Sequence, residues 1–216
     1  MFDVSVVAGL GAAALLLRWL ASTRASGGAF PAISVGSCAV LAVVATLPVV
    51  VRANLDNRLG HAASNLIGIS VKVNCQTLTG SAVDMGNELG WVAWGPDGAP
   101  EHKTLIKHQQ CNDLQAYLDS NKRHPSDEQV QAVHVLTHES MHMAGNKDEA
   151  VAECYATQHD TEMAELLGAS PADAHQLAVR YWRLFYPRMP DAYTSADCQP
   201  GGRLDLYLPT PAWSAG

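Results

Sequence analysis

The sequence predicts an α+β fold in which a short antiparallel sheet is followed by helices, with a pair of apolar helices in front. Two apolar stretches before Arg52 predict the leading pair. Residues 67–74 alternate between apolar and polar side chains, which is typical of a half-buried strand. A helical pattern that starts clearly at Ser126 predicts the first of three helices in the C-terminal half.

The leading pair is long enough to cross a membrane. The stretch Val4–Ser22 has 19 residues and one charge, at Arg18, and the stretch Phe30–Val51 has 22 residues and no charge. A helix needs about 20 apolar residues to span a bilayer, so each stretch can supply one span. The short turn between them predicts a transmembrane helical hairpin over residues 1–52. A buried core hairpin is the alternative.

Charge divides the chain at the same place. Residues 1–52 hold three arginines and one aspartate, a net charge of +2, so the other 164 residues carry −9 and bring the total to −7. Arg18 and Arg24 favour a cytoplasmic turn, whereas Arg52 and Arg58 favour the opposite orientation. The basic residues of the acidic part are dispersed and outnumbered, so no nucleic-acid partner is expected.

The cysteines of the acidic part decide the predicted orientation. They are Cys75, Cys111, Cys154 and Cys198. An even number of scattered cysteines without CxxC spacing favours disulfides in an oxidising exterior over free thiols in the cytosol. Three pairings are possible, and the sequence does not choose among them. The prediction is a protein anchored in the cell membrane, with its soluble domain outside the cell.

The soluble part begins with the polar residues 53–65, which predict a linker or the first turns after the membrane, and continues as a domain over residues 66–216. The predicted strands are Ile67–Cys75, Gly90–Trp94 and Lys103–His108. The last two are separated by a turn rich in Gly and Pro, so they can pair as a hairpin. A short helical pattern then covers Cys111–Leu118.

Three longer helices follow. Ser126 with Gln129 three residues later forms a capping-box pattern, and the helix should run to about Ala144, before Gly145. The next two helices are expected over Asp148–Leu167 and Pro171–Tyr186.

The chemistry is concentrated in the helix that starts after Ser126. It contains the pattern H-E-x-x-H, with His138, Glu139 and His142. Residues four apart share a helix face, so His138 and His142 can both bind one tetrahedral cation, Zn²⁺, with Glu139 beside the open position. This is the arrangement of zinc peptidases.

A catalytic zinc site needs a third protein ligand, and the candidates are Asp148, Glu149 and Glu153. Asp148 follows a glycine with a spacing that resembles the metzincins. Glu149 and Glu153 resemble the glutamate helix of the gluzincins, in which the first acid binds the metal and the second orients a motif histidine. If the two helices fold back on each other, Glu149 lies near His142 and Glu153 near His138. We therefore predict Glu149 as the ligand and Glu153 as the orienting carboxylate. Asp148 is either the helix cap or the rival ligand.

Over residues 126–160 the chain resembles small membrane-anchored gluzincin-type metallopeptidases of an actinobacterial kind. The resemblance implies a zincin-like domain and hydrolysis of a peptide or protein substrate, with Glu139 as general base. It also implies a tyrosine or histidine that stabilises the oxyanion. The candidates are Tyr155, His159, His175, Tyr181 and Tyr186. Only six residues separate His142 from Glu149, far fewer than in thermolysin-like enzymes.

Two further interpretations complete the prediction. His134 lies one turn before His138, but three histidines at steps of four drift off one helix face, so we expect His134 in a core or capping role. The alternative to an enzyme is a non-catalytic, zinc-stabilised binding module displayed on the membrane. An intact Glu139 favours the enzyme, because a structural zinc site needs no base.

Overall fold

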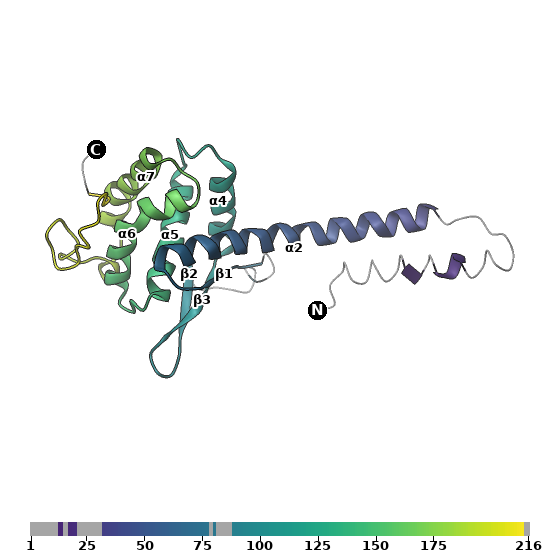
Figure 1. The fold of residues 1–216 in the computed structure, drawn as a ribbon, viewed down its shortest axis with the longest axis horizontal. Helices are drawn as coiled ribbons and strands as arrows, with labels where there is room; N and C mark the ends of the chain where they lie inside the picture. The colour runs from purple at the N-terminus through teal and green to yellow at the C-terminus, as the bar shows by residue number, and fades with distance from the viewer. Residues whose placement is uncertain (1–12, 15–16, 21–31, 78–79, 81–87, 214–216) are drawn as a thin grey trace. The chain divides into compact units, whose positions relative to one another are not determined.

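A three-stranded sheet lies beside a group of helices in this α+β protein (Figure 1). A computed structural model describes residues 13–14, 17–20, 32–77, 80 and 88–213. The chain divides into two compact units, Met1–Asn54 and Leu55–Gly216. The second unit contains the sheet and every residue of the site described below.

The sheet is mixed, so the prediction of an antiparallel sheet is wrong. The strands are β1 (Lys72–Cys75), β2 (Gly90–Trp94) and β3 (Pro100–Ile106), in the order β1-β3-β2. β2 and β3 form the predicted antiparallel hairpin, but β1 pairs with β3 in parallel. Alternation of side chains predicts a strand without predicting its partner, and here the connection after β1 leads to the opposite edge of the sheet.

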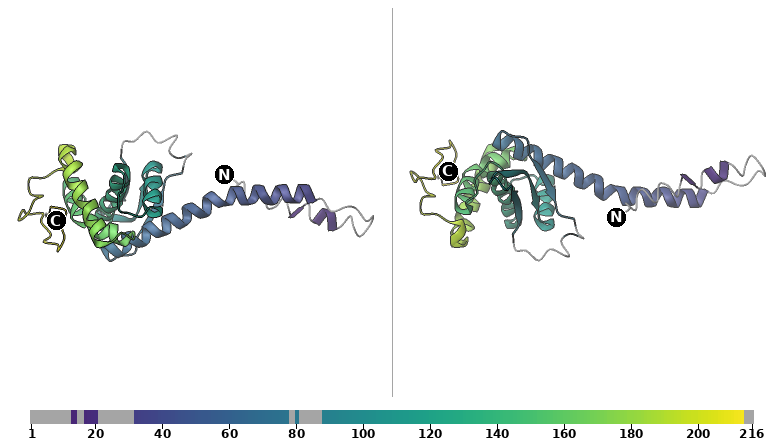
Figure 2. Two further views of the ribbon diagram at one scale, coloured as in Figure 1. Left: turned by 90° about the horizontal axis from the view of Figure 1, so that it is seen from above. Right: turned by 90° about the horizontal axis from the view of Figure 1, so that it is seen from below.

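The four helices that follow the sheet lie close to their predicted positions. They are α4 (His108–Asp119), α5 (Asp127–Met143), α6 (Glu149–Leu166) and α7 (Pro171–Leu184). The capping box of α5 is present, with the Ser126 side chain accepting from the backbone N–H of Gln129. α5 packs against α4, α6, β2 and β3, and every residue from Ala132 to Met143 is buried. The HExxH pattern therefore lies on a helix that the sheet and the neighbouring helices cover; Figure 2 shows these elements from two further directions.

Residues 53–65 are helical, although their polar composition predicted a linker. They belong to α2 (Ala32–Ile67), whose Leu55, Leu59, Ala62 and Ala63 are buried in the core. These positions recur at helical spacing, so one face of this polar segment is apolar. α2 stops where Gly68 adopts a positive φ of 73°, and β1 therefore begins later than the alternation suggested.

The predicted transmembrane hairpin is also wrong, and with it the location at the cell membrane. Within the described part of the chain, no helix has both the length and the apolar composition that crossing a bilayer requires. Most of the stretch Phe30–Val51 lies in α2, which continues past Val51 to Ile67. The other predicted span, Val4–Ser22, falls largely outside the described residues.

Two disulfides select one of the three possible cysteine pairings. Cys75 at the end of β1 is bonded to Cys111 in α4, and Cys154 in α6 is bonded to Cys198. Such bonds are typical of proteins in oxidising compartments. The first bond joins the sheet to α4, and the second joins α6 to the C-terminal part of the chain.

Candidate metal centre

Three potential ligand atoms converge between α5 and the first turn of α6. His138 Nε2 and His142 Nε2 lie 3.0 Å apart, and Glu149 Oε2 lies 3.1 Å from the first and 3.2 Å from the second. Both histidines are buried, whereas the Glu149 side chain is 42% exposed. The cluster is therefore closed by protein on one side and open on the other.

The turn between the helices brings Glu149 to this position. Gly145 has a φ of 104°, which is strained for a residue with a side chain, and its N–H donates to His142 O at 2.9 Å. Asp148 then caps α6, its Oδ1 accepting from Val151 N at 3.0 Å. The chain thus reverses in a few residues, so Glu149 starts the new helix beside His142. Asp148 serves as the helix cap.

A histidine presents an unprotonated Nε2 to the cluster when its proton is on Nδ1. His142 Nδ1 donates to Asn146 O at 2.7 Å. His138 Nδ1 makes no hydrogen bond to a described residue, but it lies 2.9 Å from Glu153 Oε2, within ion-pair distance. Such partners set the tautomer in which Nε2 binds a metal.

The spacing and charge of the three atoms fit a bound cation. A tetrahedral ion with bonds of about 2.0–2.1 Å holds its ligand atoms roughly 3.3 Å apart, slightly more than the distances here. Although burial alone lowers the pKa of His138, hydrogen bonds to Glu149 and Glu153 raise it to about 9. Hydrogen bonds from the two histidines lower the pKa of Glu149 to about 2. The cluster thus favours positive charge, and a metal ion could be held there.

Behind His138 lies a buried hydrogen-bond network centred on Glu153. Its Oε2 lies 3.0 Å from His134 Nε2, and its Oε1 accepts from the Tyr181 hydroxyl at 2.6 Å. His134 Nδ1 lies 2.8 Å from Asp160 Oδ2, and its ring stacks on Tyr181 with 3.5 Å between centroids. Tyr181 and His134 thus hold the Glu153 carboxylate in place beside His138 Nδ1.

His134 supplies the positive charge of this network. Burial by itself lowers the pKa of His134, but the adjacent carboxylates of Asp160 and Glu153 raise it to about 10. Burial raises the pKa of Glu153, yet His134 and His138 hold it far below its usual range. An imidazolium at His134 therefore balances the buried Asp160 and, together with His138, the buried Glu153.

The side chain of Glu139 extends from α5 to the two strands of the hairpin, β2 and β3. Its Oε2 accepts from the Thr104 hydroxyl of β3 at 3.2 Å. A Cβ atom on Gly90 of β2 would lie only 2.8 Å from Glu139 Oε1, so only glycine leaves room for this carboxylate. Burial raises the pKa of Glu139. A carboxylate with a raised pKa beside a metal site is suited to accept a proton.

A cavity of about 430 Å³ opens onto the cluster. Its wall includes Glu139, both motif histidines, Glu149 and most of β2. The apolar part of the wall is formed by Leu89, Trp91, Val92, Trp94, Phe185, Met189, Pro190 and Tyr193. Tyr193 ends the short 3₁₀ helix η2 (Asp191–Tyr193), and its ring centroid lies 5.9 Å from that of His138. Burial and the nearby carboxylates raise the pKa of this hydroxyl.

The structure brings together all five residues that the sequence selected: His138, Glu139, His142, Glu149 and Glu153. Of the described oxyanion candidates, Tyr181 lines the cavity, but its hydroxyl is engaged by Glu153. The other candidates, Tyr155, His159, His175 and Tyr186, are absent from the cavity wall among the described residues.

His134 is buried, as the core role predicted from the sequence requires, but sequence reasoning missed its pairing with Asp160, the role of Asp160 and that of Tyr193. A signal existed for the first two, because the histidines at 134, 138 and 142 face the acids at 160, 153 and 149 on an antiparallel helix. Tyr193 has no such signal, since it reaches the site from an irregular segment.

The site must be interpreted from its own geometry. No protein-family model, no curated protein and no solved structure matches this chain.

Proposed function

We propose that this protein is a zinc-dependent metallopeptidase of the gluzincin type, with Glu139 as its general base. The observation that carries the proposal is the convergence of His138 Nε2, His142 Nε2 and Glu149 Oε2 beside the buried carboxylate of Glu139. All four groups border one open cavity that is large enough for part of a peptide.

The donor set supports zinc as the metal. Two imidazoles and one carboxylate form the ligand set of catalytic zinc sites, which keep a fourth position open, whereas structural sites are closed by four protein ligands. The exposed side of Glu149 and the adjacent cavity provide that open position. When bound, such an ion supplies Lewis-acid polarisation of a substrate carbonyl and of a water molecule.

The residues around the cluster perform the proton transfers. Glu139 accepts a proton from the attacking water and delivers it to the leaving amine. Thr104 holds one Glu139 oxygen in place, and the bare Gly90 backbone leaves room for the other. Tyr193 donates its hydroxyl proton in a hydrogen bond to the substrate carbonyl oxygen as negative charge develops there. Glu153 keeps His138 in the metal-binding orientation.

The substrate is a peptide or protein segment in extended form. β2 lies at an edge of the sheet and contributes Gly90 to Val92 and Trp94 to the cavity wall. The free edge of such a strand can pair with an extended peptide backbone. The aromatic and aliphatic residues around it favour apolar side chains in the bound segment.

The deciding experiment measures metal content and peptide hydrolysis for the purified 216-residue chain. We expect one equivalent of zinc and cleavage of a peptide library that stops on removal of the metal with a chelator and returns when zinc is restored. One equivalent of zinc without chelator-sensitive cleavage would contradict the proposal and favour the non-catalytic, zinc-stabilised binding module.

The identity of the third ligand is tested by two neighbouring variants. Glu149→Ala should weaken zinc binding by at least the roughly 10- to 100-fold that loss of an outer hydrogen-bond partner costs. Asp148→Ala removes the cap of α6, which costs about 0.5–2 kcal/mol of stability, but should leave zinc affinity unchanged. Zinc affinities from competition with a chromophoric chelator check both values. The opposite ranking would identify Asp148 as the ligand.

A further inference from the structure

The C-terminal segment, residues 189–206, forms one wall of the cavity without regular structure of its own beyond η2. Met189, Pro190 and Tyr193 line the cavity. The backbone hydrogen bonds inside the segment close short turns, such as Tyr193 N to Pro190 O at 2.8 Å and Cys198 N to Ser195 O at 3.1 Å. Turns of this kind shape a segment locally but do not attach it to the rest of the protein.

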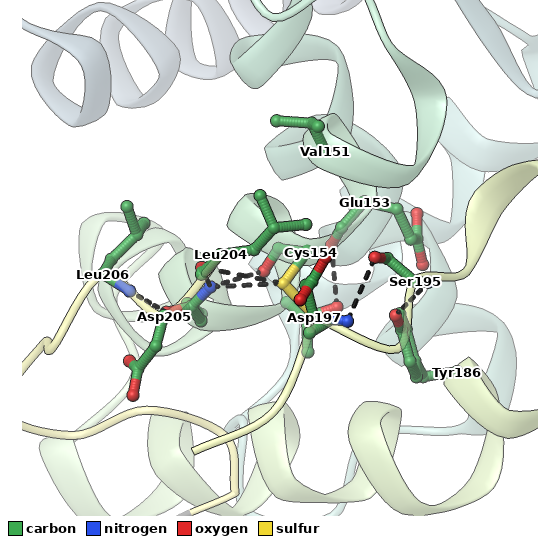
Figure 3. The surroundings of a disulfide bond; sticks show 12 residues. Val151, Glu153, Cys154, Tyr186, Ser195, Asp197, Leu204, Asp205 and Leu206 are labelled. Atoms are coloured by element: carbon green, nitrogen blue, oxygen red, sulfur yellow. Dashed lines mark hydrogen bonds between the residues drawn. A yellow bond between two sulfur atoms is a disulfide. The ribbon is translucent and has the colours of Figure 1, made fainter. Parts of the chain in front are cut away.

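Besides the packing of η2 against α6, two side chains of α6 attach the segment to the protein. Cys154 forms the disulfide with Cys198, and the Gln158 amide donates to Leu204 O at 2.9 Å and accepts from Leu206 N at 2.7 Å. Cys154 and Gln158 are one helical turn apart and both are buried. A weaker attachment comes from the 3₁₀ helix η1 (Tyr186–Arg188), where the Tyr186 hydroxyl accepts from Ser195 N at 3.2 Å (Figure 3).

The disulfide is the α6 attachment nearest to the site. Cys154 directly follows Glu153, whose carboxylate orients His138 (Figure 3). Cys198 lies five residues after Tyr193, whereas Leu204, the first contact of Gln158, lies eleven residues after it. Without the disulfide, the stretch from Tyr193 to the next side-chain attachment on α6 more than doubles in length, which increases the conformational freedom of the segment after η2.

We propose that the Cys154–Cys198 disulfide is a positioning element that holds Tyr193 over the metal centre. This inference rests on the proposed function for its effect on hydrolysis. The disulfide sets the distance between η2 and the turn of α6 that carries Glu149 and Glu153. Tyr193 therefore meets the substrate carbonyl in a preformed position and does not have to be ordered for each turnover.

The second disulfide provides a matched control. Cys75–Cys111 closes a loop of similar length, with a sequence separation of 36 against 44 for Cys154–Cys198. Its cysteines are buried between β1 and α4, and neither belongs to the described cavity wall. Removing it tests the loss of a buried disulfide without releasing the C-terminal segment.

The test combines the two disulfide variants, Cys154→Ala/Cys198→Ala and Cys75→Ala/Cys111→Ala, each with and without Tyr193→Phe. Tyr193→Phe alone should lower kcat by about 10²- to 10³-fold, the usual effect of removing one oxyanion donor. Cys154→Ala/Cys198→Ala should lower kcat comparably with zinc content unchanged, and adding Tyr193→Phe should have little further effect. In the control background Tyr193→Phe should keep its full effect. The proposal would be overturned if Tyr193→Phe lowered kcat by the same factor in the Cys154→Ala/Cys198→Ala and Cys75→Ala/Cys111→Ala variants.

Hydrogen exchange separates this inference from the proposed function, because it needs no substrate. In the zinc-loaded Cys154→Ala/Cys198→Ala variant, the amides of residues 190–198 should exchange faster than in the parent and the control. Unchanged exchange would overturn the inference even if the protein is an active peptidase. Faster exchange in a protein that cleaves no peptide would support the positioning role and contradict the peptidase.

If the double variant Cys154→Ala/Cys198→Ala does not fold, the same bond can be opened in the folded Cys75→Ala/Cys111→Ala variant with a phosphine reductant. The same rise in exchange is expected.

Discussion

Glu139→Gln is expected to lower kcat for peptide hydrolysis by about 10²- to 10⁴-fold while zinc remains bound, because the amide cannot accept the proton of the attacking water. The glutamine keeps the size of the side chain and can still contact Thr104, so the fold and the metal cluster should be preserved. Steady-state kinetics and zinc content, measured on the same preparations, test the prediction. Retention of more than about a tenth of the parent kcat would show that Glu139 is not the base.

Gly90→Ala tests the same role without changing a titratable group. The added methyl group would lie 2.8 Å from Glu139 Oε1, so the carboxylate must move away from its position between the strands. kcat should fall while zinc binding is retained.

The matched control for Glu139→Gln is Glu162→Gln on the exposed face of α6, which removes the same charge outside the site and should leave kcat unchanged. Equal losses in the Glu139 and Glu162 variants would indicate a general effect of charge.

His134→Ala is expected to lower the free energy of unfolding by about 3–5 kcal/mol, since it removes the cation beside the buried Asp160 and one of the two beside Glu153. The effect depends on pH. The pKa of His134 is about 10 in the folded protein and near 6.5 in an unfolded chain, so its contribution is complete below pH 6.5. It decreases as pH rises toward 10.

Urea unfolding of the metal-free proteins near pH 6 and near pH 10 measures this change. The difference between parent and His134→Ala should be largest near pH 6 and smaller near pH 10. His159→Ala is the control, because His159 pairs with Glu162 on the surface, where such a pair contributes about 0–1 kcal/mol. A His134→Ala cost as small as that of His159→Ala, or one that does not vary with pH, would contradict a cationic His134.

Much of the helical part could be predicted because its signals are local. The Ser126 capping box, the Gly145 turn and Pro171 at the start of α7 each act within a few residues. The convergence of His138 and His142 with Glu149 follows from the same local rules. Four residues make one turn of helix, and a short turn returns the chain in the antiparallel direction.

The errors arose where a segment's environment decides its structure. Residues 53–65 are polar on average, but the segment is helical and one face of it, which includes Leu55 and Leu59, is buried in the core. The uncharged stretch Phe30–Val51 satisfied a length criterion for a membrane span, yet most of it lies in a helix that runs on to Ile67. Average composition does not reveal which face of a helix is covered.

The local spacing of His138, Glu139, His142 and Glu149 was sufficient to predict a metal site, because helix spacing and the short turn at Gly145 place these residues on facing turns of α5 and α6. Everything that comes from distant parts of the chain depended on tertiary packing: the Thr104 and Gly90 contacts of Glu139, the His134–Asp160 pair, the disulfide pairing and Tyr193. Contacts between residues far apart in sequence form only when the core brings their elements together. Hydrophobic packing therefore decided how the predicted centre is buried, charged and enclosed.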